Sequence, residues 1–115
     1  MKASLKRGLC LLGAVCTAQP IAAADLAYPT RPIRIIVPQS PGASTDLTAR
    51  MMGQKLSEAF KQPVVIDNRP GSSGIGGTEM VARAAPDGYT LMVVASSFSI
   101  NPALGRKLPY DAIKD

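Results

Sequence analysis

Short runs of β-branched residues, each followed by a glycine- and serine-rich loop, constrain the fold of this chain most. Residues 33–37 read Ile-Arg-Ile-Ile-Val and end at Pro38, a run short and apolar enough for a buried strand of a parallel sheet. From residue 46 to about residue 60, apolar side chains recur at helical spacing. The N-cap of this helix is expected to be one of Ser44, Thr45 or Asp46. Together the two segments predict one βα unit.

The same pattern continues along the chain. It predicts strands at residues 64–66 and 89–95, a loop at residues 68–74, and a helix at residues 75–85 that ends at Pro86-Asp87-Gly88. Asn101-Pro102 marks the start of a short third helix, because proline is favoured in a first turn. Strands that alternate with helices of this length predict an α/β fold, a βαβαβ arrangement with a parallel sheet and right-handed crossovers.

The first 24 residues have the layout of a secretory signal. A basic region is followed by an apolar region at residues 9–18, about half the length that a membrane-spanning helix needs, and then by the small residues at 22–24. We therefore predict that residues 1–24 are a signal peptide cleaved after Ala24, which leaves an exported chain of residues 25–115. A lipoprotein cysteine at Cys16 is the disfavoured alternative, because residues 13–15 match a lipobox poorly.

The composition after residue 24 excludes several classes of function. Both cysteines, Cys10 and Cys16, lie in the leader, and the chain has no histidine, so we predict no disulfide, thiol nucleophile, metal site or cofactor. Three of the 13 basic residues also lie in the leader, whereas all eight acidic residues follow it. The remaining basic residues are scattered and aromatic residues are few, which argues against a nucleic-acid partner.

No catalytic or nucleotide-binding motif is present. Residues 71–77 read GSSGIGG, which lacks the spacing of a dinucleotide-binding loop, and no lysine follows as a phosphate-binding loop requires. Without histidine or cysteine, a hydrolase triad cannot be assembled. The sequence therefore predicts a protein that binds rather than an enzyme.

Two loops of the predicted sheet are suited to bind an anion. The loops at residues 39–46 and 68–74 each follow a strand and run into the N-terminus of a helix, where unpaired N–H groups and the helix dipole favour negative charge. Asp46 would repel an anion and is expected to hold its loop instead. Arg69 is open to two interpretations, a ligand clamp or a solvated cation. The remaining alternative is purely structural, with turn glycines and serine caps at Gly42, Gly71, Ser44 and Ser73.

A set of short strings, in order along residues 28–115, carries a resemblance to a known family. They are residues 28–33 (YPTRPI), 35–38 (IIVP), 41–46 (PGASTD), 68–71 (NRPG), 84–91 (AAPDGYTL), 101–102 (NP) and 108–111 (LPYD). In this combination the chain closely resembles the N-terminal third of the Bug family, the periplasmic solute-binding receptors of tripartite tricarboxylate transporters.

This resemblance implies a fold, a ligand and partners. It implies a two-domain periplasmic binding protein of type II architecture, of which residues 25–115 would be the N-terminal part of the first domain, truncated before the second. It further implies a monomer that binds a small organic carboxylate and delivers it to the membrane subunits of the transporter. Backbone amides, hydroxyls and ordered water from the loops would hold the ligand. Carried over by position, the ligand-binding residues are Pro41, Gly42, Ala43, Ser44, Thr45, Asp46, Asn68, Arg69 and Gly71.

The chain departs from the family pattern at four places. Ala43 stands where a second glycine is usual, so a positive φ there would be strained. Ser72-Ser73 removes another usual glycine, and Gly76 replaces an aliphatic residue and weakens the second helix. Gln39 replaces an aromatic or aliphatic residue and makes one wall of the pocket more polar. An exported domain that has lost binding, or that serves as a small interaction module, is the alternative to a receptor.

Overall fold

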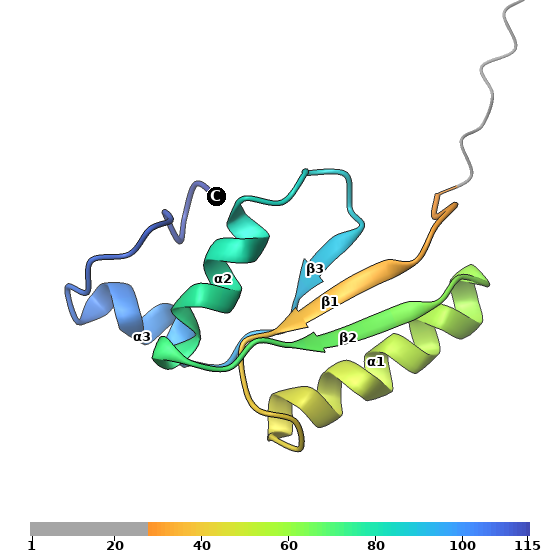
Figure 1. Ribbon diagram of the computed structural model, residues 1–115, viewed down its shortest axis with the longest axis horizontal. Helices are drawn as coiled ribbons and strands as arrows, with labels where there is room; N and C mark the ends of the chain where they lie inside the picture. The colour runs from red at the N-terminus through yellow and green to blue at the C-terminus, as the bar shows by residue number, and fades with distance from the viewer. Residues whose placement is uncertain (1–27) are drawn as a thin grey trace, which may run out of the picture.

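The computed structural model describes residues 28–115, so the predicted leader at residues 1–24 lies outside the described residues. Figure 1 shows the elements in chain order. They are β1 (Ile33–Val37), α1 (Ser44–Phe60), β2 (Val64–Asn68), the 3-10 turn η1 (Ser72–Gly74), α2 (Ile75–Ala82), β3 (Thr90–Met92) and α3 (Ser97–Ala103). The predicted α/β fold with a βαβαβ order is confirmed.

The three strands form one parallel sheet in the order β2-β1-β3. All five residues of β1 pair with β2, from Ile33 opposite Val64 to Val37 opposite Asn68. On its other side, β1 pairs with the three residues of β3. The central position of β1 explains its sequence, since a strand with neighbours on both edges and helices over it needs a continuous apolar run.

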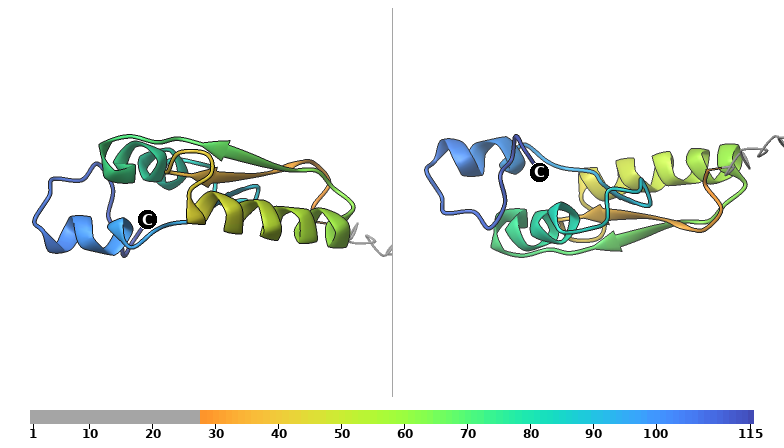
Figure 2. Two further views of the ribbon diagram at one scale, coloured as in Figure 1. Left: turned by 90° about the horizontal axis from the view of Figure 1, so that it is seen from below. Right: turned by 90° about the horizontal axis from the view of Figure 1, so that it is seen from above.

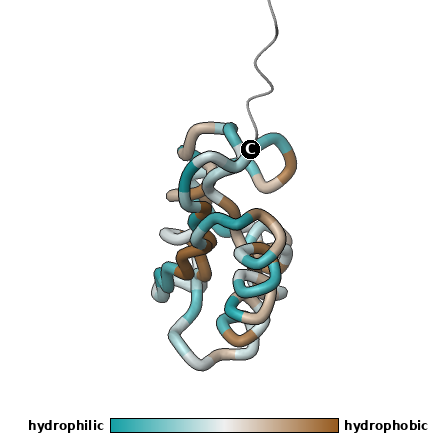
Figure 3. The backbone as a smooth tube through the Cα atoms, turned by 90° about the vertical axis from the view of Figure 1, so that its right-hand side faces the viewer, coloured by the Kyte–Doolittle hydropathy of each residue, from teal (hydrophilic) through white to brown (hydrophobic). Residues whose placement is uncertain are grey.

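The core is built around β1. Ile35 and Val37 are buried with Ala49 of α1, and half-buried apolar residues of α1, β2 and β3 surround them. Ile36 is fully buried as well, and it points to the opposite face because side chains alternate along a strand. Helix α1 packs against β1 and β2, whereas α2 packs against β1 and β3. Figure 2 shows α1 running along the strands, and Figure 3 shows the hydrophobic strand segments beside it.

The bounds of the strands and of α2 differ from the sequence prediction. β2 extends to Asn68, two residues beyond the predicted end, because the whole of β1 is available to pair with it. β3 ends at Met92 rather than at residue 95, because its partner β1 ends one residue after the Ile36–Met92 pair and the chain then turns away to α3. α2 ends at Ala82, three residues before the predicted end, with Arg83 as its C-cap.

Helix α1 differs from its prediction at its N-cap and in its buried face. The N-cap is Ala43, which makes no side-chain cap, rather than any of the three predicted residues. The buried stripe is formed by Asp46, Ala49 and Gly53. Of the apolar residues that indicated the helix, several are exposed, with Leu47, Met51 and Met52 at 56%, 71% and 49%. Small residues let the helix approach the sheet closely, so they occupy the contact in place of the larger ones.

Helix α3 begins at Ser97, four residues before the predicted start at Asn101, and Pro102 lies inside it. Its position is set by packing, because Phe98 stacks on Tyr110 with ring centroids 6.4 Å apart. The serine-rich stretch that precedes Asn101 resembles a loop in sequence, so the tertiary contact overrides the local signal. Within the described residues, no helix has the length and apolar character needed to cross a membrane.

Candidate functional site

A pocket of about 480 Å³ lies at the carboxyl-terminal edge of the sheet. Figure 1 shows that α1, α2 and α3 begin near this edge. Its lining consists of neutral residues, namely Pro38, Gln39, Ser40, Ala43, Pro70, Gly71, Ser73, Gly74 and Ser97. Ala43 and Gly74 are the N-cap residues of α1 and α2, and neither helix has a side-chain hydrogen bond at its cap. At the start of α2, the Gly74 and Ile75 N–H groups already donate to the Gly71 and Ser72 carbonyl oxygens of the 3-10 turn. The remaining first-turn N–H groups of the two helices and the positive ends of their dipoles make this pocket suited to an anion.

A hollow of the same volume, about 480 Å³, lies between α1 and β2. Its lining includes Arg50 and Glu58, so it carries charges of both signs. It runs along the side of α1, where backbone N–H groups are used within the helix, instead of at its N-terminus. The Glu58 carboxylate disfavours a bound anion there. The pocket at the strand ends is therefore the better candidate for a carboxylate.

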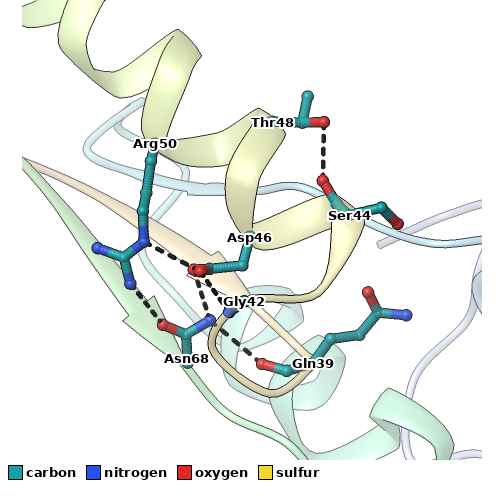
Figure 4. A network of polar contacts seen from close by, with 7 residues as sticks. All are labelled: Gln39, Gly42, Ser44, Asp46, Thr48, Arg50 and Asn68. Carbon is teal, nitrogen blue, oxygen red and sulfur yellow. Dashed lines mark hydrogen bonds and ion pairs between the residues drawn. The ribbon is translucent and has the colours of Figure 1, made fainter.

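Asp46 organises the loop that enters α1 (Figure 4). Its side chain is 2% exposed. The carboxylate accepts hydrogen bonds from the Gly42 backbone N–H at 2.8 Å, Arg50 Nε at 3.0 Å and Asn68 Nδ2 at 2.9 Å. Asn68 Nδ2 also donates to the Gln39 carbonyl oxygen at 3.2 Å. The network ties the start of α1 to the end of β2, so the prediction that Asp46 holds its loop is confirmed.

The same contacts keep Asp46 ionised. The hydrogen bond from Arg50, together with those from the Gly42 N–H and Asn68, lowers the pKa of Asp46 from 3.8 to about 2, against the opposing effect of burial. The charged carboxylate accepts hydrogen bonds from three donors at once, of which Asn68 Nδ2 is shared with the Gln39 carbonyl oxygen. It also explains why Asp46 makes no conventional cap, because its oxygens are directed to the loop and β2 rather than to the first-turn N–H groups.

Of the predicted ligand-binding residues, the structure places Ala43 and Gly71 in the lining of the pocket. Pro41, Gly42 and Ser44 lie beside it on the exposed surface of the same loop. The Thr45 hydroxyl donates to the side-chain oxygen of Gln39, so it supports the pocket wall from behind. The Ser44 carbonyl oxygen accepts a hydrogen bond from the Thr48 hydroxyl.

Asn68 and Arg69 are not among the residues that line the pocket. The Asn68 amide is used by Asp46 and Gln39, and its oxygen accepts a hydrogen bond from Arg50 at 3.3 Å. Arg69 pairs with Asp67 at 3.0 Å, while its backbone N–H donates to Val37 and continues the sheet. Arg34 and then Arg69 hold the pKa of Asp67 below its usual value. Direct ligand contacts from Asn68 and Arg69 stay predictions.

The structure adds four polar lining residues to the predicted site: Gln39, Ser40, Ser73 and Ser97. The resemblance already indicated Gln39 as a polar wall. Ser40 and Ser73 belong to the two loops that the sequence singled out, so hydroxyls facing a helix N-terminus were the available signal. Ser97 lies in the serine-containing stretch after the third strand, at the same edge of the predicted sheet, but it was not among the predicted ligand-binding residues. It reaches the pocket through the early start of α3.

Backbone strain lies at a different place from the one expected. Ala43 has φ −67° and ψ 161°, an extended conformation that alanine adopts freely, so the expected strain at this residue is absent. Positive φ occurs instead at Ser72 and Ser73, with values of 47° and 54°. Serine in the left-handed region costs about 1–2 kcal/mol. The loop entering α2 thus has glycine at two of its four positive-φ positions, Gly71 and Gly74, and serine at the other two.

We expect Ser72→Gly to stabilise the chain by about 0.5–1 kcal/mol, because glycine removes the left-handed strain at the cost of some entropy. The matched control is Ser99→Gly inside α3, where serine has helical geometry and glycine is expected to destabilise by about 0.5 kcal/mol. Urea unfolding monitored by circular dichroism measures both changes. Destabilisation by Ser72→Gly would contradict the assignment of strain to this loop.

Comparison with known proteins identifies the family. The family model described as "Tripartite tricarboxylate transporter family receptor" matches residues 48–115. The chain belongs to this family. Among curated relatives, protein BugT of Bordetella pertussis is 40% identical over 97% of this chain, and a UPF0065 protein of Bordetella bronchiseptica is 42% identical over 91%. This family member spans 36% and 32% of the lengths of those two relatives.

Several solved structures share the fold. A structure described as a periplasmic transporter is 48% identical with a TM-score of 0.72, covering 76% of this chain and 30% of its own. MatC from Rhodopseudomonas palustris with bound malate is 34% identical with a TM-score of 0.68, covering 74% and 29%. A third, from the same organism and described with adipate, is 39% identical with a TM-score of 0.61, covering 62% and 24%. The parallel sheet with its helices is thus the fold of periplasmic binding proteins.

Proposed function

We propose that this receptor chain captures a small organic carboxylate in the periplasm, without chemical transformation, for the membrane subunits of a tripartite tricarboxylate transporter. The observation that carries the proposal is the neutral pocket at which Ala43 and Gly74 place the uncapped starts of α1 and α2. An anion held there is stabilised by backbone N–H groups and by two helix dipoles, with no need for a cationic side chain.

The chemistry of the lining favours a carboxylate. Ser40, Ser73 and Ser97 bring hydroxyl groups to the same pocket, and hydroxyls donate to carboxylate oxygens. Two family structures are described with malate and adipate, which are both dicarboxylates. We propose the same class of ligand for this chain.

The proposal extends to localisation and organisation. Residues 1–24 act as a signal peptide cleaved after Ala24, and residues 25–115 form the N-terminal part of the first domain of a periplasmic solute-binding protein. The receptor works as a monomer. Membership of the family and the match to periplasmic binding proteins support these points.

The proposal is tested by titrating the isotope-labelled chain with malate, adipate and citrate and following the backbone amides by NMR. We expect shifts at Ser44, Gly74 and Ser97 that saturate at about millimolar concentration, because one set of loops leaves much of a small ligand exposed. The neutral dimethyl ester of malate is expected to produce no shifts, since it lacks the charge that the helix N-termini recognise.

A pair of charge variants provides the control. Ser40→Asp places a carboxylate in the pocket lining and is expected to weaken malate binding at least about tenfold by repulsion. Ser99→Asp adds the same charge on the exposed surface of α3, outside the lining, and is expected to leave binding unchanged. Equal loss in both variants, or no amide shifts with any of the acids, would contradict capture at this pocket.

A further inference from the structure

Gln39 presents its side chain, rather than its backbone, to the pocket at the strand ends. It directly follows the buried Pro38 at the end of β1 and lines this pocket. Its carbonyl oxygen accepts a hydrogen bond at 3.2 Å from Asn68, a residue outside the lining. Figure 4 shows the Gln39 side chain extending away from Asn68. The carbonyl group is therefore engaged on one side, and the carboxamide is the polar group that remains for the pocket.

Thr45 fixes the orientation of this carboxamide. The Thr45 hydroxyl donates to Gln39 Oε1, so the NH2 group at Nε2 occupies the opposite side of the amide. Nε2 carries two N–H donors and makes no hydrogen bond to another described residue. It is not buried either, because the Tyr110 hydroxyl is the one buried side-chain polar atom without a partner in residues 28–115. A free and accessible donor thus borders the pocket.

This donor is suited to a second oxygen of an acid that the helix N-termini already hold. A carboxylate has about four acceptor sites, which the remaining first-turn N–H groups of α1 and α2 can fill. Gln39 precedes α1 by a turn in which the Ala43 N–H donates to the Ser40 carbonyl oxygen at 3.2 Å, so its side chain belongs to a separate wall. A neutral amide donates equally well to a carboxylate, hydroxyl or carbonyl oxygen.

We propose that Gln39 determines the specificity of the pocket by donating from Nε2 to a second acceptor oxygen of the bound acid. Thr45 is the positioning residue that directs this donor, because it occupies Oε1. The inference rests on the proposed capture of a carboxylate and narrows its class. The pocket selects acids that carry a further carboxylate, hydroxyl or carbonyl oxygen over simple aliphatic monocarboxylates.

The test compares malate with butyrate, which has a single carboxylate and no other oxygen, by NMR titration of the isotope-labelled chain. Gln39→Met keeps the approximate length of the side chain without a donor. It is expected to weaken malate binding about five- to tenfold and to leave butyrate binding unchanged. Gln54→Met is the matched control, because Gln54 lies on the exposed surface of α1 outside the lining and donates to Glu58 at 3.2 Å. It is expected to change neither affinity.

Gln39→Glu separates the donor from the structural role of the side chain. The introduced carboxylate still accepts the hydrogen bond from Thr45, so the wall keeps its support, but a charged acceptor replaces the outward donor. Malate binding is expected to be weaker than in Gln39→Met, because the two negative charges repel each other. Malate affinity equal to that of the wild type would overturn the proposal.

The positioning role of Thr45 is tested through its coupling to Gln39. Thr45→Val removes the hydroxyl at constant shape and is expected to weaken malate binding about threefold, whereas Thr45→Ser restores it. Combined with Gln39→Met, Thr45→Val is expected to have no further effect, because the hydroxyl acts through the amide. A loss of the same size with and without Gln39→Met would overturn this role, since it would show that Thr45 supports the loop alone.

The titrations also distinguish this inference from the proposed capture. Equal malate affinity of the wild type and Gln39→Met, or equal losses for malate and butyrate, would overturn the role of Gln39. The backbone amides of Ser44 and Gly74 would still respond to the acids in these cases, so capture itself would stand. If no acid shifts these amides in the wild type, capture is contradicted and the specificity inferred from it falls as well.

Discussion

Gly77→Ala is expected to destabilise the chain by about 1–3 kcal/mol, although alanine is the stronger helix former. Gly77 is buried in the first turns of α2, against the end of β1. A Cβ atom at this position would lie 2.8 Å from Pro38 Cβ and 3.2 Å from the Arg69 carbonyl oxygen. The first of these atoms belongs to a proline ring and the second to the backbone, so neither can rotate away as a flexible side chain could. The helix must therefore move away from the sheet. Chemical unfolding by urea measures the loss.

Gly76→Ala provides the matched control in the same helix. Gly76 is exposed and a Cβ atom there would meet no atom within 4 Å. The substitution is therefore expected to stabilise the chain by about 0.5–1 kcal/mol through helix propensity alone. A loss of stability with Gly77→Ala and a gain with Gly76→Ala would show that close packing of α2 on Pro38 limits the size of residue 77. Equal stabilisation by both substitutions would contradict this contact.

The same displacement is expected to reach the pocket at the strand ends, because Pro38 and Gly74 belong to its lining. Gly77→Ala should therefore weaken malate binding, and Gly76→Ala should not. Comparing the NMR titrations of the two variants separates an effect on the pocket from an effect of helix propensity.

Asp46→Asn is expected to lower the melting temperature at pH 7 by about 10 °C. The substitution keeps the size of the side chain but removes the charge that receives hydrogen bonds from Arg50, the Gly42 N–H and Asn68. Asparagine keeps only one acceptor oxygen, so its NH2 group must face a donor, either Asn68 Nδ2 or the pair formed by Arg50 and the Gly42 N–H. Asp87→Asn is the control, since Asp87 pairs with Arg31 at the exposed surface and such pairs contribute little.

The acid dependence of stability identifies Asp46 specifically. Its pKa is lowered from 3.8 to about 2 in the folded chain, so between these values the unfolded chain binds more protons than the folded one. The stabilisation is present above about pH 4 and is lost as the pH falls towards 2. Between about pH 4 and pH 2, the stability of Asp46→Asn is expected to change less with pH than that of the wild type. Asp87→Asn is expected to keep the pH dependence of the wild type. Parallel curves for the wild type and Asp46→Asn, measured by thermal unfolding, would contradict the role of this carboxylate.

Much of the fold follows from local sequence. The β-branched run of β1, the helical spacing before Phe60 and the turn at residues 86–88 predict the order of the elements and a parallel sheet. Topology then places both glycine- and serine-rich loops at one edge, because all parallel strands end on the same side. This reasoning predicts which two loops form the pocket, but it does not predict which of their side chains line it.

Side-chain roles within those loops depend on contacts between distant segments. Asn68 is the last residue of β2 and has the chemistry of a ligand-binding residue, yet Asp46, 22 positions away, engages its amide. Ser97 reaches the pocket because Phe98 stacks on Tyr110 and starts α3 early. Neither contact leaves a local signal in the sequence, since each depends on what the partner segment presents.

The sequence by itself determined the α/β order, the family and the two loops, because β-branched runs, helical spacing and turn residues act over a few neighbours. The tertiary structure alone decided which face of α1 is buried, where the strain lies and which groups reach the pocket. Close approach of α1 to the sheet selects Ala49 and Gly53 over the larger Leu47 and Met51. A packing distance of this kind depends on the shapes of both surfaces that meet. A single segment of sequence encodes only its own surface, so the distance cannot be read from that segment alone.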